Sequence, residues 1–253
     1  MSFDVSASAY SRFMGQYSEP LAALFADWCS IEHGQRALDV GCGTGALTAQ
    51  LAARLGERAV AAIDPSASFV TALRDRLPDV RAAIASAEDL PFADNEFDVA
   101  LAQLVVHFMT DPVAGLREMG RVTRPGGIVA ACVWDYSGQT GPVSVFWAAA
   151  RELDPSARGE SGLAGTTEGH LADLFDEAGL QNVRSSSLTV TRRFESFDDW
   201  WRPYTLGVGP AGQYVATLSK ADRNALRARC ARLLPVAPFE TTAKAWCARG
   251  ESA

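Results

Sequence analysis

The chain has 253 residues, of which 48% are hydrophobic and 21% charged, and its formal net charge is −7. This length and composition provide a substantial core, and they exclude an intrinsically disordered or collagen-like chain. The acidic balance argues against nucleic acid or an anionic membrane surface as a partner. No apolar run reaches the length of a membrane span, and the first residues lack the basic and apolar segments of a signal peptide.

The five cysteines show neither a CxxC pair nor a cysteine–histidine pattern with the spacing of metal ligands. Their number is odd, which does not fit a complete set of disulfides. Reduced thiols are typical of the cytosol. We therefore expect a cytoplasmic protein without a metal site.

Short apolar segments alternate with helical patterns through the first half of the chain. The apolar segments are continuous, as expected of strands that are buried on both faces of a parallel sheet. They are RALDV, RAVAAID, VRAAIA, FDVALAQLVV and GGIVAACVW. Helical patterns lie between them at residues 46–55, 66–77 and 112–122. This alternation predicts a doubly wound α/β sheet with right-handed crossovers.

The second half has a different pattern. A helix is expected at residues 168–178, an alternating strand in NVRSSSLTVTRRF, a helix at 220–234 and a last alternating strand in PFETTAKAWCARG. We interpret residues 195–235 as a mostly helical cover inserted between the last two strands.

Together these patterns predict one domain over residues 1–253, with a mostly parallel seven-stranded sheet, helices on both faces and an antiparallel last strand. Residues 34–134 form its core, residues 1–33 a leading helical cover, and residues 195–235 a second cover.

The segment ALDVGCGTGALT runs from a strand through a glycine turn into a helix. Glycines allow a ligand to approach the backbone closely, and helix N-terminal amides face it. A dinucleotide fingerprint reads GxGxxG, whereas here the third glycine comes one residue early. Asp39 precedes the turn, and its carboxylate would repel a pyrophosphate but attract an amino group. The turn therefore favours an adenosine joined to a cationic group, held by Asp39, Gly41, Cys42 and Gly43.

The pattern DxGxGxG after an apolar strand resembles the first motif of the class I, Rossmann-like methyltransferases that use S-adenosylmethionine (SAM). Further elements in residues 34–134 follow in the family's order. Within the family, the chain is most similar to the type 11 group, the small-molecule enzymes that resemble the ubiquinone/menaquinone C-methyltransferases. The resemblance implies SAM as the cofactor and S-adenosylhomocysteine (SAH) as its product.

The resemblance also assigns roles after the second strand. An acid at Asp64 would accept both ribose hydroxyls, with Pro65 and Ser66 beside it. The alternative is that these three residues only begin a helix, with the proline in its first turn.

After the third strand, the resemblance implies that an acid meets the adenine amino group and that a backbone amide reads a ring nitrogen. Asp89 matches the acid's position best and Glu88 is the alternative, with Ala87 beside them. Gln103, at the end of the fourth strand, is a further expected contact to SAM.

The N-terminal segment YSRFMGQYSEPLAALF resembles the leading helix that folds over SAM in this subgroup. It implies SAM contacts from Tyr10, Arg12, Met14 and Tyr17, with Arg12 opposite the SAM carboxylate. The alternative is an amphipathic surface helix.

His107 follows the fourth strand, at the edge of the sheet where ligands bind. It is the candidate catalytic base, because histidine titrates near neutral pH. The alternative is that its ring only forms a wall of the pocket. Aromatic residues gather after the fifth strand and in the inserted cover. They indicate an apolar or aromatic acceptor pocket, although each alone fits core packing: Trp134, Trp147, Trp200, Trp201 and Tyr204.

The sequence thus predicts a SAM-dependent methyltransferase that moves a methyl group to a small, apolar or aromatic acceptor by in-line displacement. The alternatives are a nicotinamide-dependent oxidoreductase and a catalytically silent SAM-binding protein. The sequence identifies neither the acceptor nor the atom that is methylated. It also does not show whether a base takes part, and it does not distinguish a monomer from a homodimer.

Overall fold

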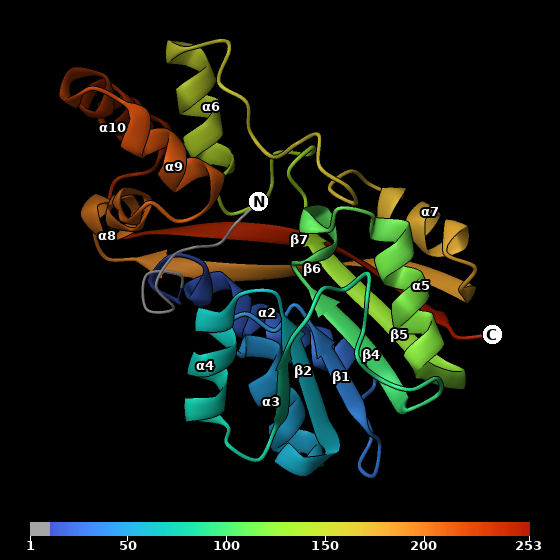
Figure 1. The fold of residues 1–253 in the computed structure, drawn as a ribbon. Coiled ribbons are helices and arrows are strands. Elements are labelled where there is room, and N and C mark those ends of the chain that lie inside the picture. The colour runs from blue at the N-terminus through green and yellow to red at the C-terminus, as the bar shows by residue number, and fades with distance from the viewer. Residues whose placement is uncertain (1–10) are drawn as a thin grey trace.

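A computed structural model describes residues 11–253, so the expected cofactor contact Tyr10 lies outside the described residues. The centre of the fold is a seven-stranded sheet in the order β3-β2-β1-β4-β5-β7-β6 (Figure 1). Only β7 runs antiparallel to its neighbours, and the other pairings are parallel. This confirms the predicted doubly wound sheet. The strands are β1 (Ala37–Val40), β2 (Val60–Asp64), β3 (Arg81–Ile84), β4 (Phe97–Gln103), β5 (Thr123–Trp134), β6 (Gln181–Phe194) and β7 (Phe239–Glu251).

Helices cover both faces of this sheet. On one face, α2 (Gln16–Trp28) and α3 (Ala46–Leu55) bury a shared apolar cluster. On the other, α5 (Pro112–Val122) and α7 (His170–Glu177) bury a second cluster. The remaining elements around the sheet are η1 (Ser11–Gly15), η2 (Glu57–Ala59), η3 (Val106–Phe108) and α4 (Ala67–Arg76), the last packed against β2 and β3.

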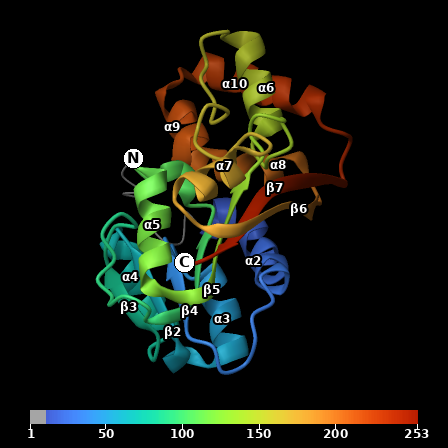
Figure 2. The same ribbon diagram turned by 90° about the vertical axis from the view of Figure 1, so that its right-hand side faces the viewer.

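A helical cover stands over the carboxyl end of the sheet (Figures 1 and 2). Four of its elements lie between β6 and β7, within the predicted insertion: α8 (Phe197–Trp201), η4 (Arg202–Leu206), α9 (Gly209–Thr217) and α10 (Lys220–Leu233). The fifth is α6 (Ser144–Leu153), which no sequence pattern predicted; it precedes β6 but packs against α10. The cover is therefore built from two separate parts of the chain.

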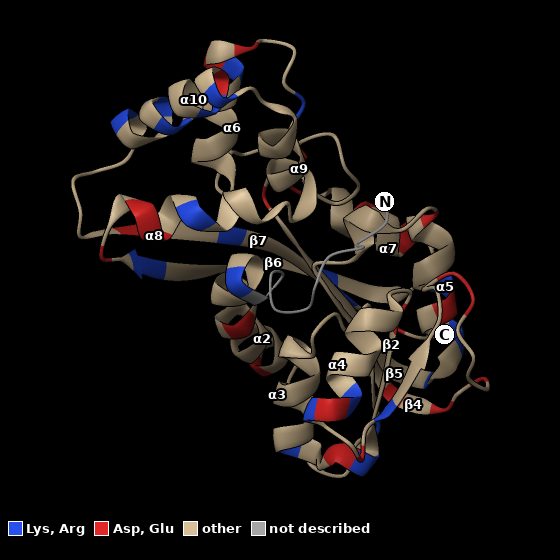
Figure 3. Cartoon of the chain, turned by 60° about the vertical axis from the view of Figure 1, so that its left-hand side comes forward, with Lys and Arg blue, Asp and Glu red and all other residues tan. Residues whose placement is uncertain are grey.

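Charged residues on the cover are of both signs (Figure 3). The basic side chains of α10 include Arg227, which pairs with Asp198 at 2.5 Å, and Arg229, which pairs with Glu152. The basic residues of this helix are thus in part neutralised by neighbouring acids. Among the described residues, no helix is both long and apolar enough to cross a membrane.

One strand is shorter than its apolar run suggested. The run FDVALAQLVV predicted a strand through Val106, but β4 ends at Gln103. Leu104 adopts a φ of +62°, and η3 follows. Leu104 and Val106 remain buried after the turn, so the apolar run continues although the strand does not. A bulky residue at positive φ is strained, and such strain gathers at functional sites.

Candidate active site

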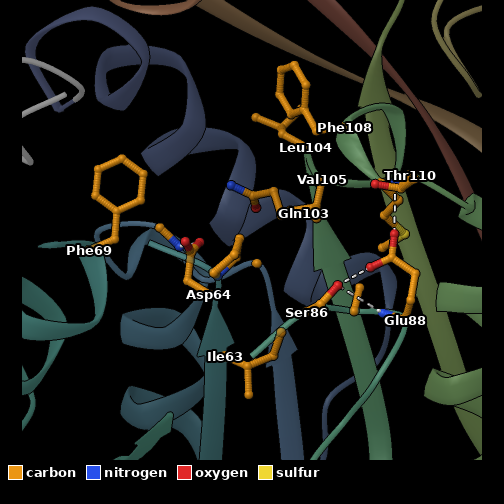
Figure 4. Close-up of a pocket in the computed structure, with 15 residues that line it drawn as sticks. Ile63, Asp64, Phe69, Ser86, Glu88, Gln103, Leu104, Val105, Phe108 and Thr110 are labelled. Carbon is orange, nitrogen blue, oxygen red and sulfur yellow. Dashed lines mark hydrogen bonds between the residues drawn. The ribbon is translucent and has the colours of Figure 1, made fainter. Parts of the chain in front are cut away.

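A cavity of about 270 Å³ opens at the carboxyl ends of β1, β2 and β4, and we call it the strand-end cavity (Figure 4). It lies where the strand order reverses, the position at which doubly wound sheets bind ligands. Its lining residues come from the ends of four strands and from the segment after β4. They are Gly41, Gly43, Ile63, Asp64, Pro65, Phe69, Ser86, Ala87, Glu88, Gln103, Leu104, Val105, Phe108, Met109 and Thr110.

The amides of the glycine turn are used within the fold. The N–H groups of Gly41 and Cys42 donate to the carbonyl of Ile63 at 2.8 and 2.9 Å, and that of Gly43 donates to Asp64 Oδ2 at 2.9 Å. These three donors are therefore not directed at a ligand. A pyrophosphate, which needs several such donors, fits this turn poorly.

Gly41 is required at its position for two reasons. Its φ is +72°, which disfavours any residue with a Cβ, and an added Cβ would collide with the side chain of Val105. Close packing of the turn against the segment after β4 thus shapes one wall of the cavity.

Asp64 ends β2 and is only 7% exposed. Its Oδ1 accepts from the amide of Ser66 at 2.8 Å, so each carboxylate oxygen holds one backbone bond and keeps acceptor capacity towards the cavity. Burial raises the pKa of Asp64, while the bonds from Ser66 and Gly43 act to lower it. The carboxylate is thereby fixed in orientation beside Pro65.

Asp39 lies beneath the glycine turn and is 1% exposed. Thr48 Oγ1 donates to its Oδ2 at 2.6 Å, and burial raises the pKa of Asp39 to about 7. With Cys42 and Gln103, it lines a narrow cavity of about 30 Å³ that adjoins the strand-end cavity. Both are lined by the same glycine turn.

The turn after β3 brings Glu88 rather than Asp89 to the strand-end cavity, together with Ala87. Glu88 Oε1 accepts from the amide of Thr110 at 2.8 Å, and Oε2 accepts from the hydroxyl of Ser86. Burial acts to raise the pKa of Glu88, but these bonds outweigh it and lower the pKa. Asp89, the better match by sequence, is exposed.

The leading helix touches this region through its backbone. Gln103 Nε2 donates to the carbonyl of Ser18 at 2.9 Å, and Gln103 Oε1 is buried without a partner among the described residues. Tyr17 instead directs its hydroxyl to Thr241 Oγ1 at 3.1 Å, and Arg12 is exposed. Neither they nor Met14 lines the strand-end cavity.

A second cavity, of about 30 Å³, lies between the leading helix, η3 and the cover, and we call it the cover cavity. It shares Leu104 and Phe108 with the strand-end cavity. Its lining is mostly apolar: Phe13, Met14, Leu104, His107, Phe108, Trp134, Tyr136, Val143, Glu160, Val208, Gly209 and Pro210.

His107 is 5% exposed, and its Nδ1 has no hydrogen-bond partner in the described chain. Desolvation by burial lowers its pKa to about 3. The ring packs against Phe108 and Tyr136 with centroid distances of 4.0 and 5.9 Å. It is therefore neutral, and it is a weak proton acceptor at neutral pH.

Glu160 was not singled out in the sequence. It is 6% exposed, and its Oε2 accepts from Trp147 Nε1 at 2.6 Å. Burial raises its pKa to about 7, against the opposing effect of the Trp147 bond. A lone acid in a loop carries no sequence signal, since only the fold brings it to a cavity.

The predicted aromatic residues separate into four positions. Trp134 lines the cover cavity, and Trp147 holds Glu160. Trp200 and Tyr204 line a smaller neighbouring cavity of about 10 Å³, with Met14 and Tyr17 among its other walls. Trp201 lines none of these three cavities and packs at a centroid distance of 6.0 Å from Tyr204.

No group of three or more histidine, cysteine or carboxylate side chains in residues 11–253 is arranged to hold a metal ion.

Comparison with known proteins agrees with this geometry. Residues 38–131 match the methyltransferase domain family. An uncharacterized methyltransferase of Mycobacterium tuberculosis is 37% identical over 135 residues, covering 53% of this chain and 52% of the relative. A ubiquinone/menaquinone biosynthesis C-methyltransferase of Idiomarina loihiensis is 40% identical over 110 residues, covering 41% and 44%. The chain thus aligns with about half the length of these relatives or less.

Solved structures show the same fold. A putative methyltransferase from Bacillus halodurans superposes with a TM-score of 0.60 at 14% identity, covering 91% of this chain and 98% of that one. Geranyl diphosphate C-methyltransferase from Streptomyces coelicolor gives 0.54 at 14% identity, covering 92% and 79%. Over residues 38–131, the chain is therefore similar in sequence to the methyltransferase domain family.

Proposed function

We propose that the protein is a SAM-dependent methyltransferase that acts on a small, apolar or aromatic acceptor and releases SAH. The observation that carries this proposal is the charge of the strand-end cavity. Its glycine-turn amides are bonded within the fold, while two carboxylates, Asp64 and Glu88, line it. Such a lining suits a nucleoside with a cationic group and opposes the pyrophosphate of a nicotinamide dinucleotide.

The residues present fit SAM part by part. Asp64 would accept the ribose hydroxyls, and Phe69, Ala87 and Met109 would enclose the adenine ring. Glu88, rather than Asp89, would face the adenine amino group. The amino acid part of SAM would lie towards the narrow cavity of Asp39. There Oε1 of Gln103, which has no partner among the described residues, offers an acceptor for an ammonium group.

When bound, SAM supplies a methyl group on a sulfonium, which is an inherently good donor. The chain then has to hold the two reactants in line and exclude water. Leu104 and Phe108 line both the strand-end cavity and the cover cavity, so methyl transfer would take place beside them. The aromatic walls of the cover cavity favour an apolar acceptor.

We further propose that residues 1–253 act as one cytoplasmic domain, with residues 1–33 and 195–235 as its covers. The expected partner is a small molecule rather than nucleic acid or a membrane. Two comparisons are in line with this: the Idiomarina relative is named for ubiquinone/menaquinone biosynthesis, and the Streptomyces structure was solved with geranyl diphosphate.

Isothermal titration with SAM, SAH and NADH tests the proposal. SAM and SAH should bind, and NADH should not. Binding of NADH without SAM would replace the proposal with an oxidoreductase. A screen of acceptors with methyl-labelled SAM then separates an enzyme from a SAM-binding protein that transfers no methyl group.

A further inference from the structure

We propose that Glu160 binds the O–H or N–H group of the methyl acceptor and takes its proton during transfer. This inference rests on the proposed function and adds to it the chemical class of acceptor. The acceptor would be a small aromatic or apolar molecule with one acidic hydrogen-bond donor, such as a phenol or an aromatic amine.

Glu160 is the carboxyl group in a mostly apolar wall. It lines the cover cavity beside Phe13, Trp134 and Val143. Apart from the bond from Trp147 to Oε2, its side chain makes no hydrogen bond within the described residues. A buried carboxyl group needs donors for its remaining acceptor positions. An acceptor molecule in the cavity would provide one.

The indole of Trp147 fixes the direction of this carboxyl group. Trp147 is on α6, is 4% exposed and packs against Phe146 with a centroid distance of 5.1 Å. Because one oxygen is held by a rigid, buried donor, the other oxygen has a defined place. This is the arrangement expected of a base, which must meet the substrate proton at one position.

The surroundings of Glu160 favour proton uptake. The titratable groups that share the cavity wall with it are His107 and Tyr136, and Tyr204 of η4 interacts with it electrostatically. Burial keeps the first of these neutral, and no lysine or arginine of the described chain lines the cavity. Among the described residues, the cavity wall therefore offers no cation to stabilise the carboxylate, which agrees with its pKa of about 7. By contrast, His107 is too weak a base at neutral pH for the role that its sequence position indicated.

The proposed step balances without a further reactant. The bond between the acceptor heteroatom and the methyl carbon forms while the bond from that carbon to sulfur breaks. The electron pair of the broken bond stays on sulfur, giving SAH, and the proton of the O–H or N–H group passes to Glu160. The cavity holds about 30 Å³, so an acceptor must displace part of its wall. Met14 is half-buried and flexible, so its side chain can give way.

Ligand-observed NMR on the SAH-saturated full chain tests the inference with two probes of similar shape, phenol and toluene. We expect phenol to bind about tenfold more tightly than toluene at pH 8, because a hydrogen bond to a charged group raises binding affinity by about this factor. The preference should fall several-fold at pH 6, where a carboxyl group with a pKa of about 7 is mostly protonated. Glu160→Gln should have a small, pH-independent preference, and the exposed control Glu168→Gln should behave as the wild type.

Equal binding of the two probes to the wild type, or no binding of either, would overturn the inference. So would an unchanged pH response in Glu160→Gln. Saturation with SAH is measured first by calorimetry, so that a failure of the proposed function appears there and is distinguished from a failure at Glu160. The circular dichroism spectrum of each variant shows whether it is folded.

Discussion

The strand-end cavity and the cover cavity are built in different ways. The first takes much of its lining from short runs at the ends of neighbouring strands, such as residues 63–65 and 86–88. The second collects single side chains from distant segments, among them Phe13, Glu160 and Val208. The difference shows that the expected cofactor site is formed by residues that are close together in the sequence. The expected acceptor site forms only when the cover has folded over the sheet.

The largest effect should come from the strand-end cavity. Asp64→Ala removes two charged acceptors for the ribose hydroxyls. Each of these hydrogen bonds contributes roughly one to three kcal/mol to binding, so we expect SAM affinity to fall about 100-fold. Calorimetry measures it, and Asp75→Ala, an exposed acid on α4, is the matched control. An unchanged affinity would remove Asp64 from the ribose site.

The second effect belongs to the cover cavity and concerns stability. The pKa of Glu160 is about 7 in the folded chain and 4.5 in the reference state. The folded state therefore holds the proton of the Glu160 carboxyl group more tightly than the unfolded state does. This proton stabilises the folded state fully below pH 4.5, and the stabilisation is lost as the pH rises through 7. The glutamine of Glu160→Gln does not titrate. Between pH 5 and pH 8, the free energy of unfolding of this variant should therefore rise by about 2 kcal/mol relative to that of the wild type.

Urea denaturation at the two pH values measures this gain in the free energy of unfolding. Glu168→Gln, whose side chain is exposed, should show none. A wild type and a Glu160→Gln variant with parallel pH dependence would show that this carboxyl group titrates in the same way whether or not the chain is folded.

A third variant tests the tight packing of the glycine turn. Gly41→Ala should weaken SAM binding about tenfold, because the added Cβ collides with Val105 and moves the cavity wall. Gly34→Ala is the control, since Gly34 also has a positive φ, of +90°, but nothing lies within 4 Å of an added Cβ. Equal SAM affinity in both variants would mean that the collision is relieved without moving the wall.

The smallest expected effect concerns the leading helix and tests whether its Tyr17 belongs to the cofactor site. Tyr17→Phe removes the hydrogen bond to Thr241, so we expect a loss of about 1 kcal/mol in the free energy of unfolding. SAM affinity should stay the same, because Tyr17 does not line the strand-end cavity. A drop in SAM affinity above about threefold would place this hydroxyl in the cofactor site after all, as the family resemblance implied.

Much of the fold could be predicted because local patterns and tertiary burial agree. The helices expected at 46–55 and 112–122 have the bounds of α3 and α5, and β1 to β5 overlap the five continuous apolar runs. The end of β4 could not be predicted, since Leu104 leaves the sheet at positive φ although its apolar side chain fits a strand. The role of α6 in the cover also has no local signal, because it depends on packing against α10.

By itself, the sequence determined the doubly wound sheet, the glycine turn and the acid at the end of β2. These depend on residues that are near one another in the chain, where periodicity and turn geometry act directly. Only the tertiary structure decided that Glu88 lines the strand-end cavity, that His107 is held neutral and that Glu160 enters the cover cavity. Burial and the neighbours of a charge set these properties, and both arise from segments that meet only in the folded chain.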